Sequence, residues 1–338
     1  MRPRAAWLAA GLISAAALAQ GPVPPGHPVL GLGYGLDHVV VAVRDLEATK
    51  AVFRDALGFR MPAPGVSGRH PSGTVNASAY FADQSYLELL AVRERELVAR
   101  HHPETLAFLD RQEGVLALAL STSSARDTAA ALRARGLRMR DPAAGTVQRA
   151  SDAAPPPPKW WVAAFEKPAP APLFFIEYLG TDYADMALNW AEGYREAQAA
   201  PAYRHANGAL GLSAVWLVVR DIAAESALYE RLLSAPVRDF DSTALGARVR
   251  EFRLVRQRLF LLQALDDAGA AGRFLAERGP GVMGVSVGVR DLTVTAARLL
   301  AGPVPLARRQ PGLVKSDTLL VPGPRAAGLW LEFHEARE

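Results

Sequence analysis

Two glutamates interrupt apolar runs and need a chemical explanation. Glu88 lies inside Tyr-Leu-Glu-Leu-Leu, and Glu177 lies inside Phe-Phe-Ile-Glu-Tyr-Leu. Burial of a carboxylate is costly unless the group is paired with a cation or binds a metal ion. Because side chains alternate between the two faces of a strand, either glutamate could instead point to solvent. Both residues are therefore candidates for acid–base or metal chemistry, with a solvent-facing carboxylate as the alternative.

Two histidines and an asparagine accompany these acids. His38 lies in a valine-rich strand, where a lone histidine is either a ligand or a hydrogen-bonded core residue. His70 lies on a loop rich in glycine and proline. Such a loop can cover a cavity and supply a catalytic acid or base, and a solvated histidine is the simpler alternative. Asn76 begins the next strand and either donates to a substrate oxygen or caps a turn.

Two adjacent tryptophans come after the proline run 155–158. In a strand, one of Trp160 and Trp161 must point into a cavity and the other away from it. We assign Trp161 to the wall of a substrate pocket, with ordinary core packing as the alternative.

The tripeptide Val-Arg-Asp occurs three times, and it shows how these residues are positioned. Each copy closes an apolar run with the character of a strand and opens a segment with the character of a helix. A weaker fourth copy lies between the first two. This pattern predicts one β-α unit used four times, each continuing into paired strands. The four stretches are 35–46, 114–125, 211–222 and 281–292.

Composition favours two exported globular domains. The chain has 338 residues, of which 50% are hydrophobic, so two cores are possible. Residues 1–19 combine Arg2 and Arg4 with a short apolar run that ends in Ala-Leu-Ala, which is typical of a secretory signal peptide. A retained anchor or a buried helix is the alternative. The expected location is periplasmic or secreted, and the absence of cysteine means that no disulfides support the fold.

The charge gives no argument for nucleic acid or an anionic membrane as a partner. The formal net charge is +4, and loss of Arg2 and Arg4 with the signal peptide lowers it to +2. We expect no stable membrane span after cleavage. The predicted layout is a tether at 20–34, a first domain at 35–181, a connecting helix and linker at 182–208, and a second domain at 209–338.

Three stretches carry a family resemblance. They are Leu-Asp-His-Val-Val at 36–40, Gly-Arg-His-Pro-Ser-Gly-Thr-Val-Asn at 68–76 and Tyr-Leu-Glu-Leu-Leu at 86–90. With the tandem units, they resemble the vicinal oxygen chelate superfamily, and within it the glyoxalase-like domain branch. The resemblance implies an α+β fold in which tandem βαβββ units form two domains with cupped mixed sheets. It also implies a metal inside the first cup, held by His38, Glu88 and Glu177. The usual fourth ligand is missing, because an apolar residue stands near Leu116.

Three functions are hypotheses at this point. The first is a lyase, isomerase or dioxygenase that binds a small substrate with two adjacent oxygens through Mn²⁺, Fe²⁺ or Zn²⁺, with His70 as the assisting acid or base. The second is a metal-free protein that sequesters a small ligand, as in the bleomycin resistance relatives. The third is a scaffold for oligomer contacts. These hypotheses differ in whether a metal and a reaction are required.

Comparison of the four copies places the active half in the first domain. At the position of His38 the third and fourth units have Ala214 and Gly284, and the position of Glu88 falls near Leu262 or Gln263 in the third and at Glu332 in the fourth. The second domain is therefore expected to be a degenerate copy that packs against the first, covers it or forms a homodimer. His205 and Asn207 are expected on the linker surface.

Overall fold

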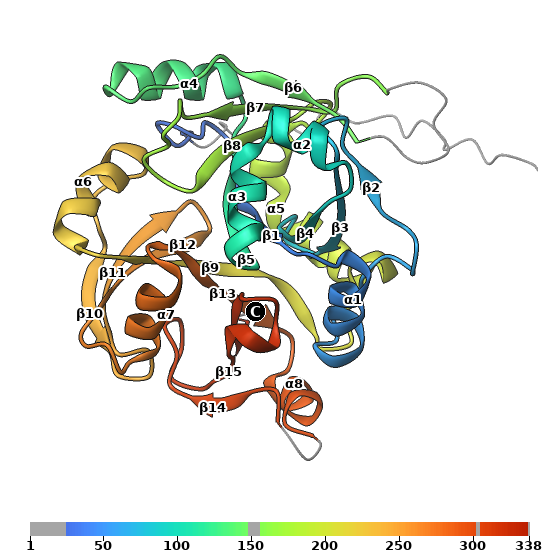
Figure 1. The fold of residues 1–338 in the computed structure, drawn as a ribbon, viewed down its shortest axis with the longest axis vertical. Helices are drawn as coiled ribbons and strands as arrows, with labels where there is room; N and C mark the ends of the chain where they lie inside the picture. Colours follow the sequence, from blue (N-terminus) through green and yellow to red (C-terminus); the bar gives the residue numbers. More distant parts are fainter. Residues whose placement is uncertain (1–24, 148–155, 302–304, 337–338) are drawn as a thin grey trace, which may run out of the picture.

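The computed structural model describes residues 25–147, 156–301 and 305–336, so the predicted signal peptide lies outside the described residues. The strands form two eight-stranded sheets, one in each half of the chain (Figure 1). In each sheet the first strands of two βαβββ units pair antiparallel at the centre, β1 with β5 and β9 with β13. The last strand of each unit pairs parallel with the first, as in β1 with β4. The predicted α+β fold of tandem βαβββ units is confirmed.

The two sheets have the same strand order, β2-β3-β4-β1-β5-β8-β7-β6 in the first and β10-β11-β12-β9-β13-β16-β15-β14 in the second. The first sheet consists of β1 (Gly35–Ala42), β2 (Gly68–Arg69), β3 (Thr74–Tyr80), β4 (Tyr86–Val92), β5 (Gly114–Ser121), β6 (Ala143–Gly145), β7 (Trp160–Ala164) and β8 (Leu173–Tyr178). The second consists of β9 (Ala209–Val219), β10 (Arg238–Ser242), β11 (Ala247–Leu254), β12 (Gln257–Ala264), β13 (Gly281–Val289), β14 (Arg308–Gln310), β15 (Thr318–Val321) and β16 (Trp330–Glu335).

The repeated Val-Arg-Asp motif marks the point where a strand ends and a helix begins. Asp45, Asp221 and Asp291 are N-caps whose carboxylates accept backbone N–H groups of the first helical turn, and Ser124 caps the helix of the weaker copy. The helices are α1 (Leu46–Ala51, continued by a π-helical turn at Val52–Ala56), α2 (Arg95–His101), α3 (Pro103–Arg111), α4 (Ala125–Ala134), α5 (Tyr183–Ala199), α6 (Ile222–Leu232), α7 (Ala270–Arg278) and α8 (Leu292–Leu299).

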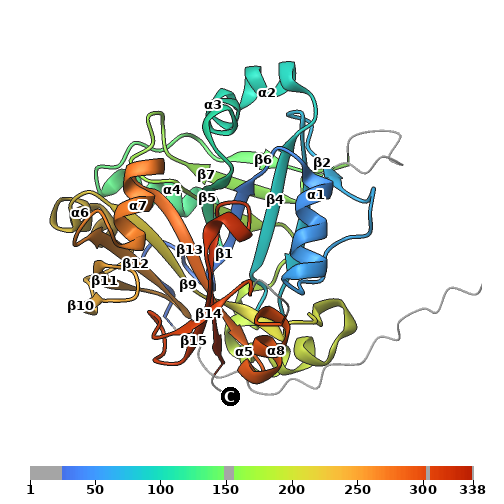
Figure 2. The same ribbon diagram turned by 60° about the horizontal axis from the view of Figure 1, so that its bottom comes forward.

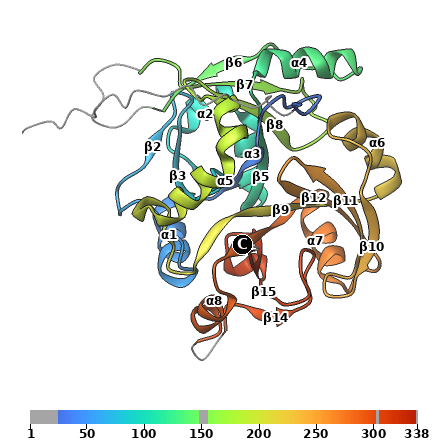
Figure 3. The same ribbon diagram turned by 180° about the vertical axis from the view of Figure 1, so that it is seen from behind.

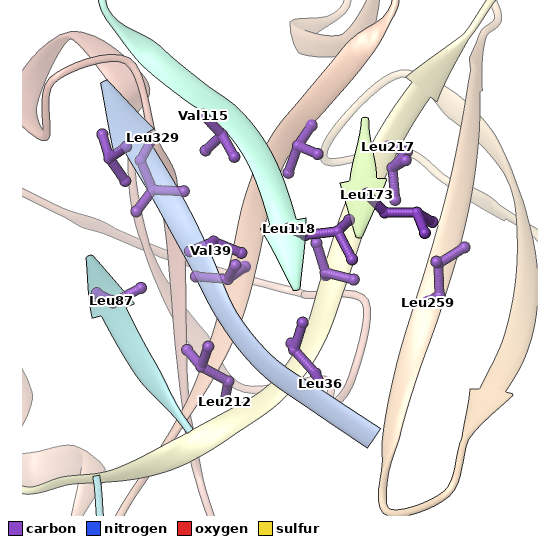
Figure 4. Packing of buried hydrophobic residues seen from close by; sticks show 14 of the residues in the cluster. Leu36, Val39, Leu87, Val115, Leu118, Leu173, Leu212, Leu217, Leu259 and Leu329 are labelled. Carbon is purple, nitrogen blue, oxygen red and sulfur yellow. The ribbon is translucent and has the colours of Figure 1, made fainter. Parts of the chain in front are cut away.

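One face of each sheet contributes to a single shared core. Figure 4 shows Val39 and Leu118 of the first sheet in the same buried cluster as Leu212, Leu217 and Leu259 of the second. The strands at the centres of the two sheets meet in the middle of the molecule (Figure 2). The two halves are therefore stabilised by common apolar burial, and we expect them to unfold together.

The opposite faces of the two sheets differ. The second sheet covers this face with a separate apolar cluster that includes Trp216, Phe260 and Phe274 of α7. The corresponding face of the first sheet carries buried polar side chains, among them His38 and Glu88. The first sheet thus carries titratable side chains on the face that points away from the shared core.

His205 and Asn207 of the linker after α5 are buried, which contradicts the prediction that they lie on the surface. The Nδ1 atom of His205 accepts from the backbone N–H of Arg60 at 2.9 Å, and the Nδ2 atom of Asn207 donates to the carbonyl of Leu57 at 2.8 Å. Burial lowers the pKa of His205 to about 4. The linker passes between the end of the first helix and the second sheet, so its polar side chains satisfy backbone groups that water cannot reach. Figure 3 shows α5 in front of the first sheet.

Within the described parts of the chain, no helix is both long enough and apolar enough to cross a membrane.

Candidate functional site

A β-bulge at the start of β1 brings Asp37 and His38 together. The pairing of β1 with β5 shifts register between Leu36 and His38, and Leu36 and Val39 both belong to the shared core. The two residues between them can therefore turn to the other face. His38 Nδ1 lies 2.5 Å from Asp37 Oδ1, and Asp37 is completely buried.

Two tyrosine hydroxyls complete the surroundings of Asp37. Tyr34 donates to Oδ2, and Tyr178 donates to Oδ1 at 3.0 Å. Burial, followed by the charge of Asp37, raises the pKa of both Tyr34 and Tyr178 well above the ordinary value, so both phenols remain donors. Because Asp37 also faces Nδ1 of His38, it fixes the orientation of the imidazole and leaves Nε2 free.

Glu88 lies at the centre of the polar group. Its Oε2 is 3.5 Å from Nε2 of His38, and its Oε1 is 3.8 Å from Nε2 of His70. The amide of Asn76 donates to Oε1 at 2.8 Å. Burial favours the neutral acid, but the two imidazoles and the Asn76 amide together hold the pKa of Glu88 below its ordinary value. We call Asp37, His38, His70, Asn76 and Glu88 the Glu88 cluster.

Aromatic rings enclose the two imidazoles. Tyr86 stacks on His38 with 4.3 Å between ring centroids, and Phe174 meets the same imidazole edge-on at 5.6 Å. Trp160 meets His70 edge-on at 6.3 Å. The apolar surroundings strengthen the electrostatic interactions of Glu88, because little water screens them.

Glu177 does not join this cluster. In the first unit Val40 pairs with Glu88, and in the second unit the equivalent Ala119 pairs with Phe174. Glu177 lies three residues beyond Phe174 and therefore on the opposite face of the strand. Its Oε2 accepts from the backbone N–H of Ala125 at 2.8 Å, at the N-terminus of α4, where a helix favours negative charge.

The predicted set of His38, Glu88 and Glu177 therefore does not fit a metal ion. Within residues 25–147, 156–301 and 305–336, no group of three or more His, Cys, Asp and Glu side chains is placed to hold one. His38 and His70 approach different oxygens of Glu88, and the Asn76 amide already donates to one of these oxygens. This donor set supports no metal-dependent step.

Trp160, and not Trp161, faces the cluster. Trp160 pairs with Tyr178 across β7 and β8, whereas Trp161 pairs with Glu177 and is 36% exposed. Asn76 lies inside β3 with its amide on Glu88, which excludes the alternative of a turn cap and leaves its contact with a substrate as a prediction.

Three residues of the site were not predicted from the sequence, namely Asp37, Tyr34 and Tyr178. An acid beside a histidine in a valine-rich strand was a signal for Asp37. Neither tyrosine had such a signal. Tyr34 lies three residues before Asp37, and Tyr178 reaches Asp37 from β8 through tertiary packing.

Two buried polar atoms at the cluster make no hydrogen bond to the described residues, although one of them lies 3.8 Å from Oε1 of Glu88. They are Nε2 of His70 and Oγ of Ser78. Ser78 pairs with Glu88 across β3 and β4, so its side chain points to the same face. Since buried polar atoms are nearly always hydrogen-bonded, these two atoms indicate a place for a polar ligand beside Glu88.

The second sheet has different side chains at the same positions. Trp216 pairs with Phe260, which stands where Leu262 or Gln263 was expected, and Ser286 pairs with Glu332. Glu332 accepts from the backbone N–H of Leu313 at 2.7 Å and from the Ser286 hydroxyl at 3.0 Å. Burial raises its pKa. The Glu332 carboxyl group is thus hydrogen-bonded and lies on the packed face of the second sheet, where burial favours its neutral form.

Comparison with known proteins agrees with this architecture. A family profile described as "Glyoxalase-like domain" matches residues 36–233. The crystal structure of a hypothetical protein from Staphylococcus aureus is 12% identical and covers 89% of this chain and 98% of its own, with a TM-score of 0.55, which shows a shared fold. A search of curated proteins gave no match.

Methylmalonyl-CoA epimerases match a shorter part of the chain. The enzyme from Mycobacterium tuberculosis is 24% identical over 39% of this chain and 91% of its own, with a TM-score of 0.34. The enzyme from Streptomyces coelicolor, in complex with 2-nitronate-propionyl-CoA, is 18% identical over 38% of this chain and 97% of its own, with a TM-score of 0.33.

Proposed function

The chain belongs to the glyoxalase-like domain family, and from this premise we propose that the Glu88 cluster is the active site of an enzyme that moves a proton on a small oxygenated molecule. The observation that supports this proposal most directly is the position of Glu88. Its buried carboxyl group has a lowered pKa and therefore stays ionised, beside two polar atoms that make no hydrogen bond to the described residues. Perturbed titratable groups next to unsatisfied donors are typical of catalytic sites.

The proposed step is proton transfer at a carbon next to a carbonyl group. The Glu88 carboxylate takes the proton, and the electron pair of the broken C–H bond moves onto the carbonyl oxygen. His70 Nε2 and Ser78 Oγ are placed to donate hydrogen bonds to two neighbouring substrate oxygens, which stabilises this charge. Glu88 then returns the proton to the former carbonyl carbon, while the proton of the neighbouring hydroxyl group moves to the former carbonyl oxygen, so that the carbonyl and hydroxyl groups exchange places. The net change is an isomerisation, with no redox partner.

Asp37 and His38 assist Glu88 without touching the reacting carbon. Asp37 holds the imidazole by Nδ1, so that Nε2 stays beside Oε2 of Glu88.

Proton exchange with D₂O tests the proposal without knowledge of the natural substrate. The protein would be incubated with small 2-hydroxy and 2-oxo carbonyl compounds, and loss of the C–H signal followed by NMR. We expect exchange with at least one compound, and a rate lower by about 10²- to 10⁴-fold in Glu88→Gln, because general base catalysis contributes this much.

Two results would contradict the proposal. Exchange that a chelator abolishes and Mn²⁺, Fe²⁺ or Zn²⁺ restores would support the metal-dependent hypothesis instead. Binding of a compound without exchange would support the second candidate, a binding protein, which the aromatic rings around His38 and His70 also favour.

We also propose that the protein is exported after cleavage behind Ala19, on the basis of the apolar run at residues 5–19. The intact mass of the protein recovered from a periplasmic or culture fraction would test this proposal. A mass that retains residues 1–19 would contradict it.

A further inference from the structure

Each half of the chain places one hairpin turn on the first strand of the other half. In the first half, Ser85 in the β3–β4 turn accepts from the backbone N–H of Leu212 at 2.9 Å. In the second half, Gln257 at the β11–β12 turn accepts from the backbone N–H of Leu36 at 3.0 Å. Leu36 and Leu212 occupy the same position in the repeated unit, and the strand pairing shifts register beside each. The two contacts are therefore equivalent.

Both contacts depend on a glycine at the start of the strand. Gly35 has φ of +107°, and a Cβ atom there would lie 2.8 Å from the carbonyl oxygen of Leu254, closer than Cβ atoms are found. A Cβ atom on Gly211 would overlap the carboxylate of Asp83. The repeated Gly-Leu pair is thus explained by the close approach of the opposite turn.

The contacts at Leu36 and Leu212 differ in the residue that follows each leucine in the chain. Asp37 of the Glu88 cluster comes next in β1, whereas Ser213 comes after Leu212 in β9. A second path leads from the same turn to Asp37. The Arg256 guanidinium lies 3.5 Å from the ring centroid of Trp190, this ring stacks on Tyr34 at 5.8 Å, and the Tyr34 hydroxyl donates to Asp37.

We propose that Gln257 and Arg256 are positioning residues of the Glu88 cluster, so that the second half of the chain completes the site in the first. The N–H of Leu36 borders the bulge, where the regular ladder with β5 is interrupted, and Gln257 satisfies it. Without the Gln257 acceptor, regular pairing of β1 with β5 becomes more favourable than the bulge. Regular pairing would turn the Asp37 side chain away from His38. Arg256 acts on the other side of Asp37 by holding Trp190 against Tyr34.

The His38 ring reports this positioning directly. A proton on Nδ1 that is hydrogen-bonded to a buried carboxylate gives a separate downfield NMR resonance and exchanges slowly with water. In Gln257→Leu we expect its exchange rate to rise by about tenfold, the effect of losing roughly one hydrogen bond. Ser85→Ala is the control, because it removes the equivalent bond at Leu212, together with the bond that the Ser85 hydroxyl donates to Asp83. It should lower the melting temperature by a similar amount and leave the His38 resonance unchanged.

Arg256→Ala and Arg256→Lys test the second path in case Gln257→Leu does not fold. The alanine variant should increase exchange of the His38 proton, and the lysine variant, which keeps a cation over Trp190, should restore most of the protection. The inference is overturned if the resonance is unchanged in both Gln257→Leu and Arg256→Ala, or if Ser85→Ala changes it equally.

The importance of this positioning for turnover rests on the proposed function, but the resonance needs no substrate. A changed resonance together with absent C–H exchange supports the positioning role and contradicts the proposed reaction. An unchanged resonance together with Glu88-dependent C–H exchange contradicts the positioning role and supports the proposed reaction.

Discussion

Three glutamates in similar sequence contexts have three different environments. Glu88 faces two imidazoles, Glu177 faces the N-terminus of α4, and Glu332 faces backbone N–H groups and a serine. The pKa is lowered at Glu88 and raised by burial at Glu332. The chemistry of a carboxyl group is therefore decided by its neighbours, and Glu88 combines burial with a lowered pKa.

The pH dependence of stability tests the environment of Glu88. Because its pKa in the folded protein is lowered, ionised Glu88 stabilises the fold above about pH 4.3, the ordinary value, and this contribution is lost as the pH falls through the folded pKa. In Glu88→Gln this part of the acid sensitivity should be absent. We expect the difference in free energy of unfolding between wild type and variant to change by about 1–3 kcal/mol between neutral and acidic pH, measured by urea denaturation. A difference that does not depend on pH would show that Glu88 is not ionised in the fold.

At the scale of elements, the repeated motif predicted the units and their helix caps but not the orientation of every strand. Trp161 and Glu177 pair across β7 and β8 and share one face, so both assignments fail for the same reason. Alternation shows only that neighbouring side chains of a strand point in opposite directions. The register of β8 with β5 is needed to show which side chains face His38. Glu88 and Glu177 looked alike in the sequence, because each carboxylate interrupts an apolar run, and only the register of each strand separates them.

The bulge in β1 could not be predicted from alternation. A regular strand would place the side chains of Asp37 and His38 on opposite faces. The shift of register instead brings Oδ1 of Asp37 to 2.5 Å from Nδ1 of His38. The tyrosines around Asp37 come from the chain before β1 and from β8, which are far apart in sequence. The contact of Tyr178 depends on tertiary packing that one sequence does not reveal.

At the scale of the whole molecule, the two halves share a core and exchange hairpin turns, so each half depends on the other for stability. Asp83 lies at this junction, in the β3–β4 turn against Gly211. Burial raises its pKa to about 7, although the Ser85 hydroxyl and backbone oppose this shift. The junction therefore carries a carboxyl group that titrates near neutral pH.

Asp83→Asn should remove this pH dependence. Because the pKa of Asp83 is raised, its contribution to stability is complete below about pH 3.9, the ordinary value, and is lost as the pH rises through about 7. Above that pH the variant should be more stable than wild type by roughly 1–3 kcal/mol, and the two should be similar only near about pH 4. Thermal unfolding at both pH values measures this. Equal pH dependence in the two proteins would contradict the burial of Asp83 at the junction.

The central claim is that the reactive carboxylate is Glu88 and that its two sequence counterparts have structural roles. The most direct measurement is the rate of C–H exchange in D₂O for Glu88→Gln, Glu177→Gln and Glu332→Gln. Our account predicts a loss of about 10²- to 10⁴-fold for Glu88→Gln. Glu177→Gln should keep the wild-type rate and lose only about 0.3–1 kcal/mol of stability at the N-terminus of α4, and Glu332→Gln should also keep the rate. A loss in either counterpart as large as that in Glu88→Gln would contradict the account.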